Sequence, residues 1–181
     1  MMHEDIKQIL LTKEQIAARV EEMGKQITAD YQGKDLVVVV LLKGAAWFAT
    51  DLTRAIDLPL RVDFMVASSY GNGTSTTGNV KVKLDLGENI AGKHVLLIDD
   101  IIDSGVTFAA ISDMLRLNKP ASLKTCALCD KAERRINDLE ADYVGFKIPD
   151  EFVVGFGLDY AGDYRNLPYI GVLKPSVYAR K

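Results

Sequence analysis

The sequence predicts an α/β protein in which helices flank a mostly parallel sheet and a small subdomain is appended near the C-terminus. Two apolar runs, Leu36–Leu42 and Val95–Ile98, are bounded by polar residues, which is typical of strands buried on both faces of a parallel sheet. Stretches with helical spacing of apolar residues alternate with these runs, which favours right-handed connections between parallel strands. The 181 residues fit one compact domain with ample core.

The N-terminal third is expected to hold two helices and two strands. Thr12-Lys-Glu-Gln15 is a capping-box pattern, and it opens a helix over residues 12–31 whose core-facing side chains are Ile16, Val20, Met23 and Ile27. Gly33 is a suitable stop. The run Leu36–Leu42 then leads into a helix over residues 45–57, with a core side formed by Trp47, Phe48, Leu52 and Ile56. A strand over residues 61–69 follows.

The rest of the chain continues the alternation and then changes character. Residues 71–78 include three glycines and no core-forming side chain, so a loop is expected there. Strands are predicted over residues 80–84, 94–100 and 121–129, and a helix over 106–118 carries Ile111, Met114, Leu115 and Leu117. Residues 143–173 have the pattern of short strands and turns rather than another strand–helix repeat, which indicates the appended subdomain.

Composition excludes several classes of partner. The net charge of −3 argues against a broad cationic surface, so nucleic acid is not an expected partner. No apolar stretch has the length of a membrane span, and the first residues lack the basic start and apolar core of a secretory signal. We therefore expect a cytoplasmic protein without a membrane partner.

The two cysteines, Cys126 and Cys129, have a Cys-x-x-Cys spacing that can also hold zinc or carry redox chemistry. Here they fall within a predicted strand, where side chains three apart point to opposite faces. No second pair or nearby histidine completes a metal site. Buried structural thiols are the better interpretation. With only two histidines in the chain, histidine-based acid–base chemistry is not expected.

The most informative segment is the strand that begins at His94 and the acidic turn that follows it. Asp99, Asp100 and Asp103 come at the carboxyl end of this strand, where open α/β sheets bind ligands. The turn Ser104-Gly105-Val106-Thr107 opens a helix, and free amides with nearby hydroxyls form an anion site. Acids beside a phosphate need a divalent cation or ligand hydroxyls between them. A turn with solvated acids would explain Gly105 but not three carboxylates. The segment therefore predicts a phosphorylated, hydroxylated ligand and a hard metal ion.

This segment resembles the phosphoribosyl-diphosphate (PRPP) signature of type I phosphoribosyltransferases. The carboxylate at Asp103 is similar to that of the 6-oxopurine salvage enzymes, the hypoxanthine(-guanine) phosphoribosyltransferases. Further motifs fall in the same family's order over nearly the whole chain: Leu41-Leu42-Lys43-Gly44, Ser68-Ser69-Tyr70, Lys131, Phe152-Val153-Val154-Gly155, Leu158-Asp159-Tyr160 and Arg165.

The resemblance implies the type I phosphoribosyltransferase fold as a single domain over residues 1–181. Its core would span about 35–130, and a base-binding hood would come from the N-terminal segment and from about 143–175. The implied activity is purine salvage, a Mg²⁺-dependent transfer of the 5-phosphoribosyl group from PRPP to N9 of hypoxanthine and guanine, with release of pyrophosphate. PRPP and a 6-oxopurine would be the small-molecule partners, and relatives form homodimers or homotetramers.

The same resemblance assigns roles around the signature. Asp99 and Asp100 correspond to the pair that holds the ribose hydroxyls, directly or through metal-bound water. Asp103 corresponds to the general base that faces N7 of the purine. The 5′-phosphate would be held by the loop residues Asp103, Ser104, Gly105, Val106 and Thr107. Some relatives have a basic residue in place of Val106, so we expect phosphate binding to be weaker but retained.

Pyrophosphate would be bound by Lys43, Gly44 and Arg165, with Asp159 as a ligand of the magnesium that it carries. Relatives have a cis peptide between the residues that correspond to Leu42 and Lys43, whereas an ordinary helix start after a strand needs none, and the sequence leaves both open. Ser69 and Tyr70 correspond to a lid that excludes water from the activated sugar.

Base recognition would fall to Lys131, Phe152, Val153 and Asp159. The Lys131 ammonium can donate to a 6-oxo group, while the 6-amino group of adenine would leave it unpaired. Phe152 offers a flat face for stacking, and the backbone groups of Val153 and Asp159 would contact the remaining ring edge.

Three alternatives stay open at this point. A phosphoribosyltransferase-fold RNA-binding regulator of pyrimidine genes is disfavoured by Asp103 and by the lack of a basic cluster. A phosphoacceptor receiver domain would have its acid pair on the first strand rather than past mid-chain. Within the enzyme family, a preference for xanthine or guanine is equally compatible with the sequence.

Overall fold

The computed structural model describes residues 2–69 and 80–179 and contains two sheets. The elements in chain order are η1 (Met2–Asp5), β1 (Ile6–Leu11), α1 (Lys13–Asp30), β2 (Leu36–Leu42), α2 (Ala45–Ala55), β3 (Leu60–Ser69), β4 (Val80–Leu84), β5 (His94–Ile102), α3 (Val106–Leu117), β6 (Ser122–Asp130), η2 (Ala132–Arg134), β7 (Tyr143–Lys147), β8 (Val153–Val154), β9 (Ile170–Leu173) and α4 (Pro175–Tyr178).

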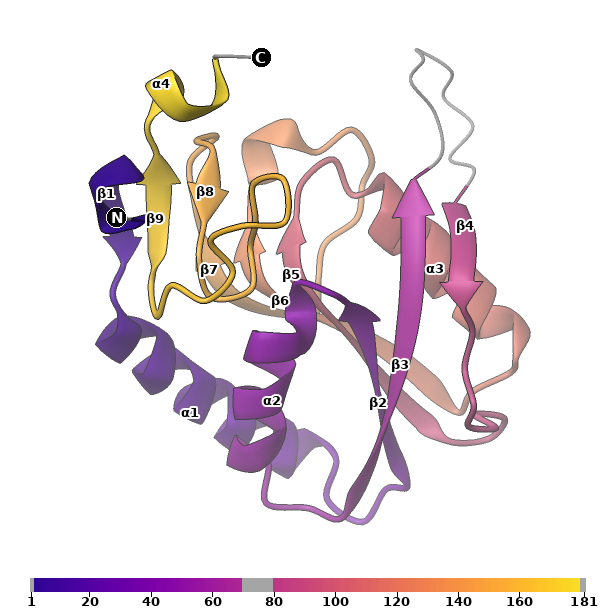
Figure 1. Cartoon of the computed structure of the whole chain (residues 1–181). Coiled ribbons are helices and arrows are strands. Elements are labelled where there is room, and N and C mark those ends of the chain that lie inside the picture. Colours follow the sequence, from indigo (N-terminus) through magenta and orange to yellow (C-terminus); the bar gives the residue numbers. More distant parts are fainter. Residues whose placement is uncertain (1, 70–79, 180–181) are drawn as a thin grey trace.

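The main sheet has six strands in the order β4-β3-β2-β5-β6-β7 (Figure 1). All neighbouring strands are parallel except β3 and β4, which pair antiparallel. The mostly parallel α/β class is therefore confirmed, and β2 and β5, predicted as buried strands, are central. Because ligand sites in such sheets lie beyond the carboxyl ends of the strands, this order puts the ends of β2, β5 and β6 next to one another.

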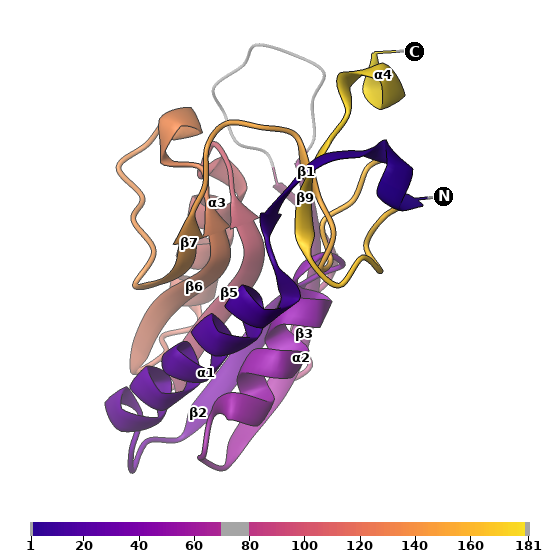
Figure 2. The same ribbon diagram turned by 90° about the vertical axis from the view of Figure 1, so that its left-hand side faces the viewer.

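Side chains that alternate along β2 divide the core into two layers. Leu36, Val38 and Val40 pack with residues of α1 and α2, whereas Val37 and Val39 pack with residues of α3. Figure 2 shows α1 and α2 side by side on one face of the sheet. The predicted capping box is present, since the Gln15 amide donates to Thr12 Oγ1 and the Thr12 amide donates to Gln15 Oε1.

A second, three-stranded antiparallel sheet, which we call the hood sheet, has the order β1-β9-β8. It joins the two ends of the chain (Figure 1). β7 lies within the residues expected in the hood, about 143–175, but it pairs in parallel with β6 and extends the main sheet. The expected boundary is therefore too early, because a strand of five residues carries too little pattern to tell which sheet it joins.

Two residues expected in the core are exposed. Trp47 keeps 38% of its surface because the buried side of α2 is formed by Ala45, Phe48, Ala49 and Leu52. Its ring approaches Gly157 of the C-terminal segment instead. Leu117, at the last turn of α3, is 80% exposed because Ile111 and Leu115 already fill the buried side.

Cys126 and Cys129 are free and buried, as expected for structural thiols. Burial raises the pKa of both thiols above its ordinary value, so neither has the thiolate character that metal binding or redox chemistry needs. Within residues 2–69 and 80–179, no helix is long and apolar enough to cross a membrane.

Candidate active site

The carboxyl end of β5 presents two adjacent acids. The strand runs to Ile102, two residues past its predicted end, so Asp99 and Asp100 lie within it. Both side chains are partly buried. Desolvation, followed by repulsion from Asp100, raises the pKa of Asp99 well above its ordinary value. Desolvation also raises the pKa of Asp100, against a smaller opposing effect from the Arg165 guanidinium. A cation placed here would relieve this electrostatic cost.

The acidic turn after β5 forms a cavity of about 200 Å³ at the start of α3. We call it the loop cavity; its lining includes Asp99, Asp103, Ser104, Gly105 and Thr107. Gly105 is the N-cap of α3 with a φ of 83°, a left-handed conformation that favours glycine. The first amides of a helix have no helical partner, which suits an anion; of these, the Val106 amide makes a long hydrogen bond of 3.5 Å to Ser104 Oγ.

The loop after β2 packs against Asp100. The peptide between Leu42 and Lys43 is cis, which settles the alternative that the sequence left open. Gly44 packs so closely that a Cβ atom there would lie 1.6 Å from Asp100 Oδ2. Any larger residue would displace the carboxylate.

The C-terminal segment packs against the loop after β2 through Gly157 and Arg165. A Cβ atom on Gly157, whose φ is 101°, would lie 2.0 Å from the Gly44 carbonyl oxygen. Arg165 donates to the Gly157 carbonyl and pairs with Asp159, with Nη2 2.6 Å from Oδ1. The structure therefore brings together four of the predicted residues: Gly44, Asp100, Asp159 and Arg165.

A second cavity, of about 330 Å³, lies between the end of β6 and the hood sheet. We call it the hood cavity; it is lined by Asp100, Ile101, Asp103, Lys131, Arg134, Phe152, Val153, Leu158 and Asp159. Ile101 and Asp103 line both cavities, so the two adjoin. Lys131 is only 6% exposed, and its Nζ lies 3.8 Å from Asp150 Oδ1. A buried ammonium with one distant carboxylate keeps donors for a ligand.

Arg134 is a cavity residue that the sequence reasoning missed. Its Nε lies 3.0 Å from Asp103 Oδ1, and Nη1 lies 3.6 Å from Asp150 Oδ1. Asp103 Oδ1 is itself shielded from solvent and accepts no well-directed hydrogen bond from the described residues. The sequence offered one signal for Arg134, namely a basic residue three positions after Lys131, but no motif of the family includes it.

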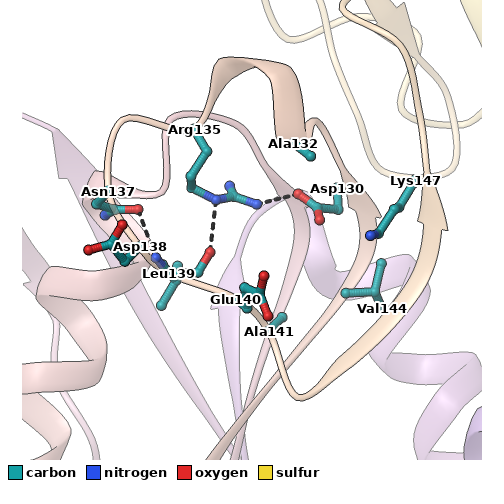
Figure 3. Close-up of a pocket in the computed structure, with 10 residues that line it drawn as sticks. All are labelled: Asp130, Ala132, Arg135, Asn137, Asp138, Leu139, Glu140, Ala141, Val144 and Lys147. Atoms are coloured by element: carbon teal, nitrogen blue, oxygen red, sulfur yellow. Dashed lines mark hydrogen bonds and ion pairs between the residues drawn. The ribbon is translucent and has the colours of Figure 1, made fainter.

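The sequence analysis also missed Arg135, which hydrogen-bonds to the backbone of the acidic turn. Its guanidinium pairs with Asp130 and donates to the carbonyls of Leu139 and Asp103. Figure 3 shows it within a separate cavity of about 400 Å³. That cavity is larger than the other two, but it lacks the acids of β5 and the turn amides. We therefore assign the chemistry to the loop and hood cavities.

The remaining predicted site residues are the metal ligands and the two lid residues. In the described part of the chain, no three His, Cys, Asp or Glu side chains form a metal cluster by themselves. Asp99, Asp100 and Asp159 offer the oxygen ligands that a hard cation takes, but they do not form one three-carboxylate site, so such a cation needs substrate phosphates and water as further ligands. Ser69 ends β3, and Tyr70 lies outside the described residues.

A strand-end acid pair beside a glycine-containing turn that opens a helix, on a mostly parallel sheet, is the architecture of a phosphoribosyltransferase. The family model described as phosphoribosyl transferase domain matches residues 7–161. A hypoxanthine-guanine phosphoribosyltransferase of Staphylococcus aureus is 54% identical over 178 residues, which cover 98% of this chain and 99% of that protein.

Solved structures give the same result. A hypoxanthine phosphoribosyltransferase crystal structure from Staphylococcus aureus superposes with a TM-score of 0.95 at 54% identity, covering 98% of this chain and 96% of that one. A Trypanosoma cruzi mutant hypoxanthine phosphoribosyltransferase, solved as a ternary complex with substrates, gives 0.93 at 42% identity, covering 97% and 99%. The chain belongs to the hypoxanthine-guanine phosphoribosyltransferase family, purine-salvage enzymes that need a divalent metal. These relatives favour the enzyme over the RNA-binding regulator and the receiver domain.

Proposed function

We propose that this protein transfers the 5-phosphoribosyl group from PRPP to N9 of hypoxanthine and guanine. The observation that carries this proposal is the adjoining pair of cavities with Asp103 between them. The loop cavity offers acids, hydroxyls and amides for a sugar phosphate, and the hood cavity offers a buried ammonium and an aromatic ring for a planar base. A transition state with ribosyl-cation character needs positioned reactants and a neutralised leaving group rather than a covalent nucleophile.

In this proposal the turn holds the sugar phosphate. The 5′-phosphate accepts hydrogen bonds from backbone amides of residues 104–107 and from the hydroxyls of Ser104 and Thr107. Asp99 and Asp100 hold the ribose hydroxyls. Val106 adds no cation, which is compatible with amide-based recognition.

Lys43, Gly44 and Arg165 bind the pyrophosphate. Arg165 pairs with Asp159 in the free site, so it is already held beside the leaving group's position. We propose Mg²⁺ as the metal, with Asp159, Asp99 and Asp100 as its protein ligands. When bound, Mg²⁺ would supply positive charge to the leaving pyrophosphate. Ser69 and Tyr70 form the lid that excludes water.

Lys131 donates to the 6-oxo group, Phe152 stacks on the ring, and backbone groups of Val153 and Asp159 contact the remaining edge. The Asp103 carboxylate faces N7 and accepts its proton as N9 attacks the sugar. Because Arg134 pairs with Asp103 in the free site, purine binding requires its guanidinium to turn away, and Asp150 is within reach as its second partner.

We further propose a cytoplasmic homodimer or homotetramer that uses neither nucleic acid nor membrane as a partner. Light scattering after size exclusion would give the subunit number. A filter-binding titration with RNA would test the regulator alternative, because salt-sensitive tight binding would contradict the proposal.

The activity is tested by incubating the purified protein with PRPP, Mg²⁺ and each base in turn, and following nucleotide formation by absorbance. We expect product with hypoxanthine and guanine and none with adenine. Xanthine, included as a third base, would define the specificity at position 2 of the ring. Failure to form product with both hypoxanthine and guanine would overturn the proposal.

A further inference from the structure

Three aromatic rings form a cluster at the outer edge of the hood cavity. Phe152 and Tyr178 are stacked, with ring centroids 5.0 Å apart and planes 23° apart. Tyr160 meets Phe152 edge-on at 5.6 Å and lies 6.5 Å from Tyr178. Tyr178 comes from α4, beyond residues 7–161 that match the family model.

The hood sheet places Tyr178 there. The Leu173 amide donates to the Phe152 carbonyl at 2.8 Å, which ties the end of β9 to the residue before β8. The Lys174 amide donates to the Asp5 carbonyl at 2.9 Å and fixes the chain just before α4. Val177 and Tyr178 then pack on a small apolar cluster that includes Val154 and Leu173. The position of Tyr178 is therefore set by long-range pairing rather than by a free tail.

Tyr178 covers only one side of Phe152. Among the described residues, those lining the hood cavity include Phe152 but neither Tyr160 nor Tyr178. Phe152 keeps 39% of its surface exposed. Tyr178 is stacked on one face of the ring, while another part of the same ring lines the hood cavity. An isolated side chain half in solvent would sample several orientations, whereas a stacked partner restricts the ring plane.

We propose that Tyr178 is a positioning residue for the purine: it backs Phe152 and holds its ring in the plane on which the base stacks. The proposal rests on the function above, in which Phe152 stacks on the base. It predicts that losing the Tyr178 ring weakens purine binding and leaves the sugar-phosphate side unchanged, because the residues that line the loop cavity include none of the three rings.

The test compares Tyr178→Leu, which keeps apolar volume for the packing on Val154 and Leu173, with Tyr178→Phe, which keeps the ring. KM for hypoxanthine, KM for PRPP and kcat are measured with thermal melting of the full chain. We expect Tyr178→Leu to raise KM for hypoxanthine about three- to tenfold, the range that an aromatic pair corresponds to. KM for PRPP should stay unchanged, and Tyr178→Phe should behave as the parent. An unchanged KM for hypoxanthine, or an equal rise in KM for PRPP, would overturn the proposal.

A double variant with Phe152→Leu separates this inference from the function on which it rests. If Tyr178 acts through Phe152, adding Tyr178→Leu to Phe152→Leu causes no further rise in KM for hypoxanthine; additive effects would overturn the proposal. If Phe152→Leu raises this KM and Tyr178→Leu does not, only the positioning role fails. If Phe152→Leu alone changes nothing, the stacking role fails and the inference fails with it.

Discussion

The loop cavity and the hood cavity adjoin at Asp103 but are built in opposite ways. All of the described residues that line the loop cavity come from one continuous stretch, Asp99 to Phe108, at the end of a central strand. The hood cavity takes residues from the end of β5, the end of β6, η2 and the segment from Phe152 to Asp159. The first is fixed by local geometry on a buried strand, and the second by pairing between distant parts of the chain.

This difference divides the expected chemistry. The loop cavity is made of amides and carboxylates on a rigid frame, as electrostatic stabilisation of a reacting sugar requires. The hood cavity is made of long or planar side chains that recognise a base. Substitutions in the first should therefore change turnover, and substitutions in the second should change the KM for the base.

Asp103 lies where the cavities meet, and its replacement should have the largest effect. We expect Asp103→Asn to lower kcat about a hundredfold or more, the contribution of a positioned general base, with little change in KM for PRPP. Asp113→Asn is the matched control, since Asp113 is an exposed residue of α3 that pairs with Arg116. Steady-state kinetics with both substrates decides the point. Equal losses in kcat and PRPP affinity would count against the base role.

Gly44 tests how rigid the site is around Asp100, which lines the hood cavity from the end of β5. Gly44→Ala would place a Cβ atom 1.6 Å from Asp100 Oδ2, so the loop or the carboxylate must shift. Displacements of about 1 Å near reacting groups cost up to about a hundredfold in rate, and we expect a loss of kcat/KM for PRPP in that range. Gly87→Ala is the control, because its nearest neighbour would be 4.0 Å away. A fully active Gly44→Ala would show that the loop after β2 adapts and that its close approach to Asp100 is not needed for activity.

Lys131 tests the hood side. Lys131→Met removes the buried ammonium, so a 6-oxo group loses its donor while the apolar stem remains. We expect KM for hypoxanthine to rise by about tenfold or more, KM for PRPP to change little, and the discrimination against adenine to shrink. Lys147→Met, on the exposed part of β7 next to Asp130, is the control. An increase in both KM values together would indicate a structural role.

The same contrast explains which features could be predicted. Asp99, Asp100 and Asp103 could be recognised because one short segment contains the strand, the acids and the turn. Arg134 and Tyr178 could not, since their contacts depend on how η2 folds back on the turn and on the pairing of β1 with β9. Trp47 was wrongly predicted to lie in the core. Helical spacing identifies the side of α2 that faces the core, but it does not tell that Trp47 lies at the border of that side, where the segment around Gly157 packs. The side chains of the lid segment stay a prediction.

The smallest expected effect is on the stability of the fold, which the partly buried acid pair Asp99 and Asp100 lowers. The pKa of Asp99 is raised in the folded protein above its unfolded value of about 3.9. The folded state thus keeps this proton to a higher pH than the unfolded state, and stability falls as pH rises from about 4 through the raised pKa.

In metal-free protein, Asp99→Asn removes this penalty, so the variant should melt at a higher temperature than the parent at pH 8 and at nearly the same temperature at pH 4. A gain of about 2–4 °C would correspond to 1 kcal/mol in a chain of this size. Asp113→Asn, which replaces an exposed carboxylate of α3, is the matched control. A variant that melts lower than the parent at pH 8 would mean that Asp99 stabilises the fold, and the loop cavity would then be a structural feature as much as a binding site.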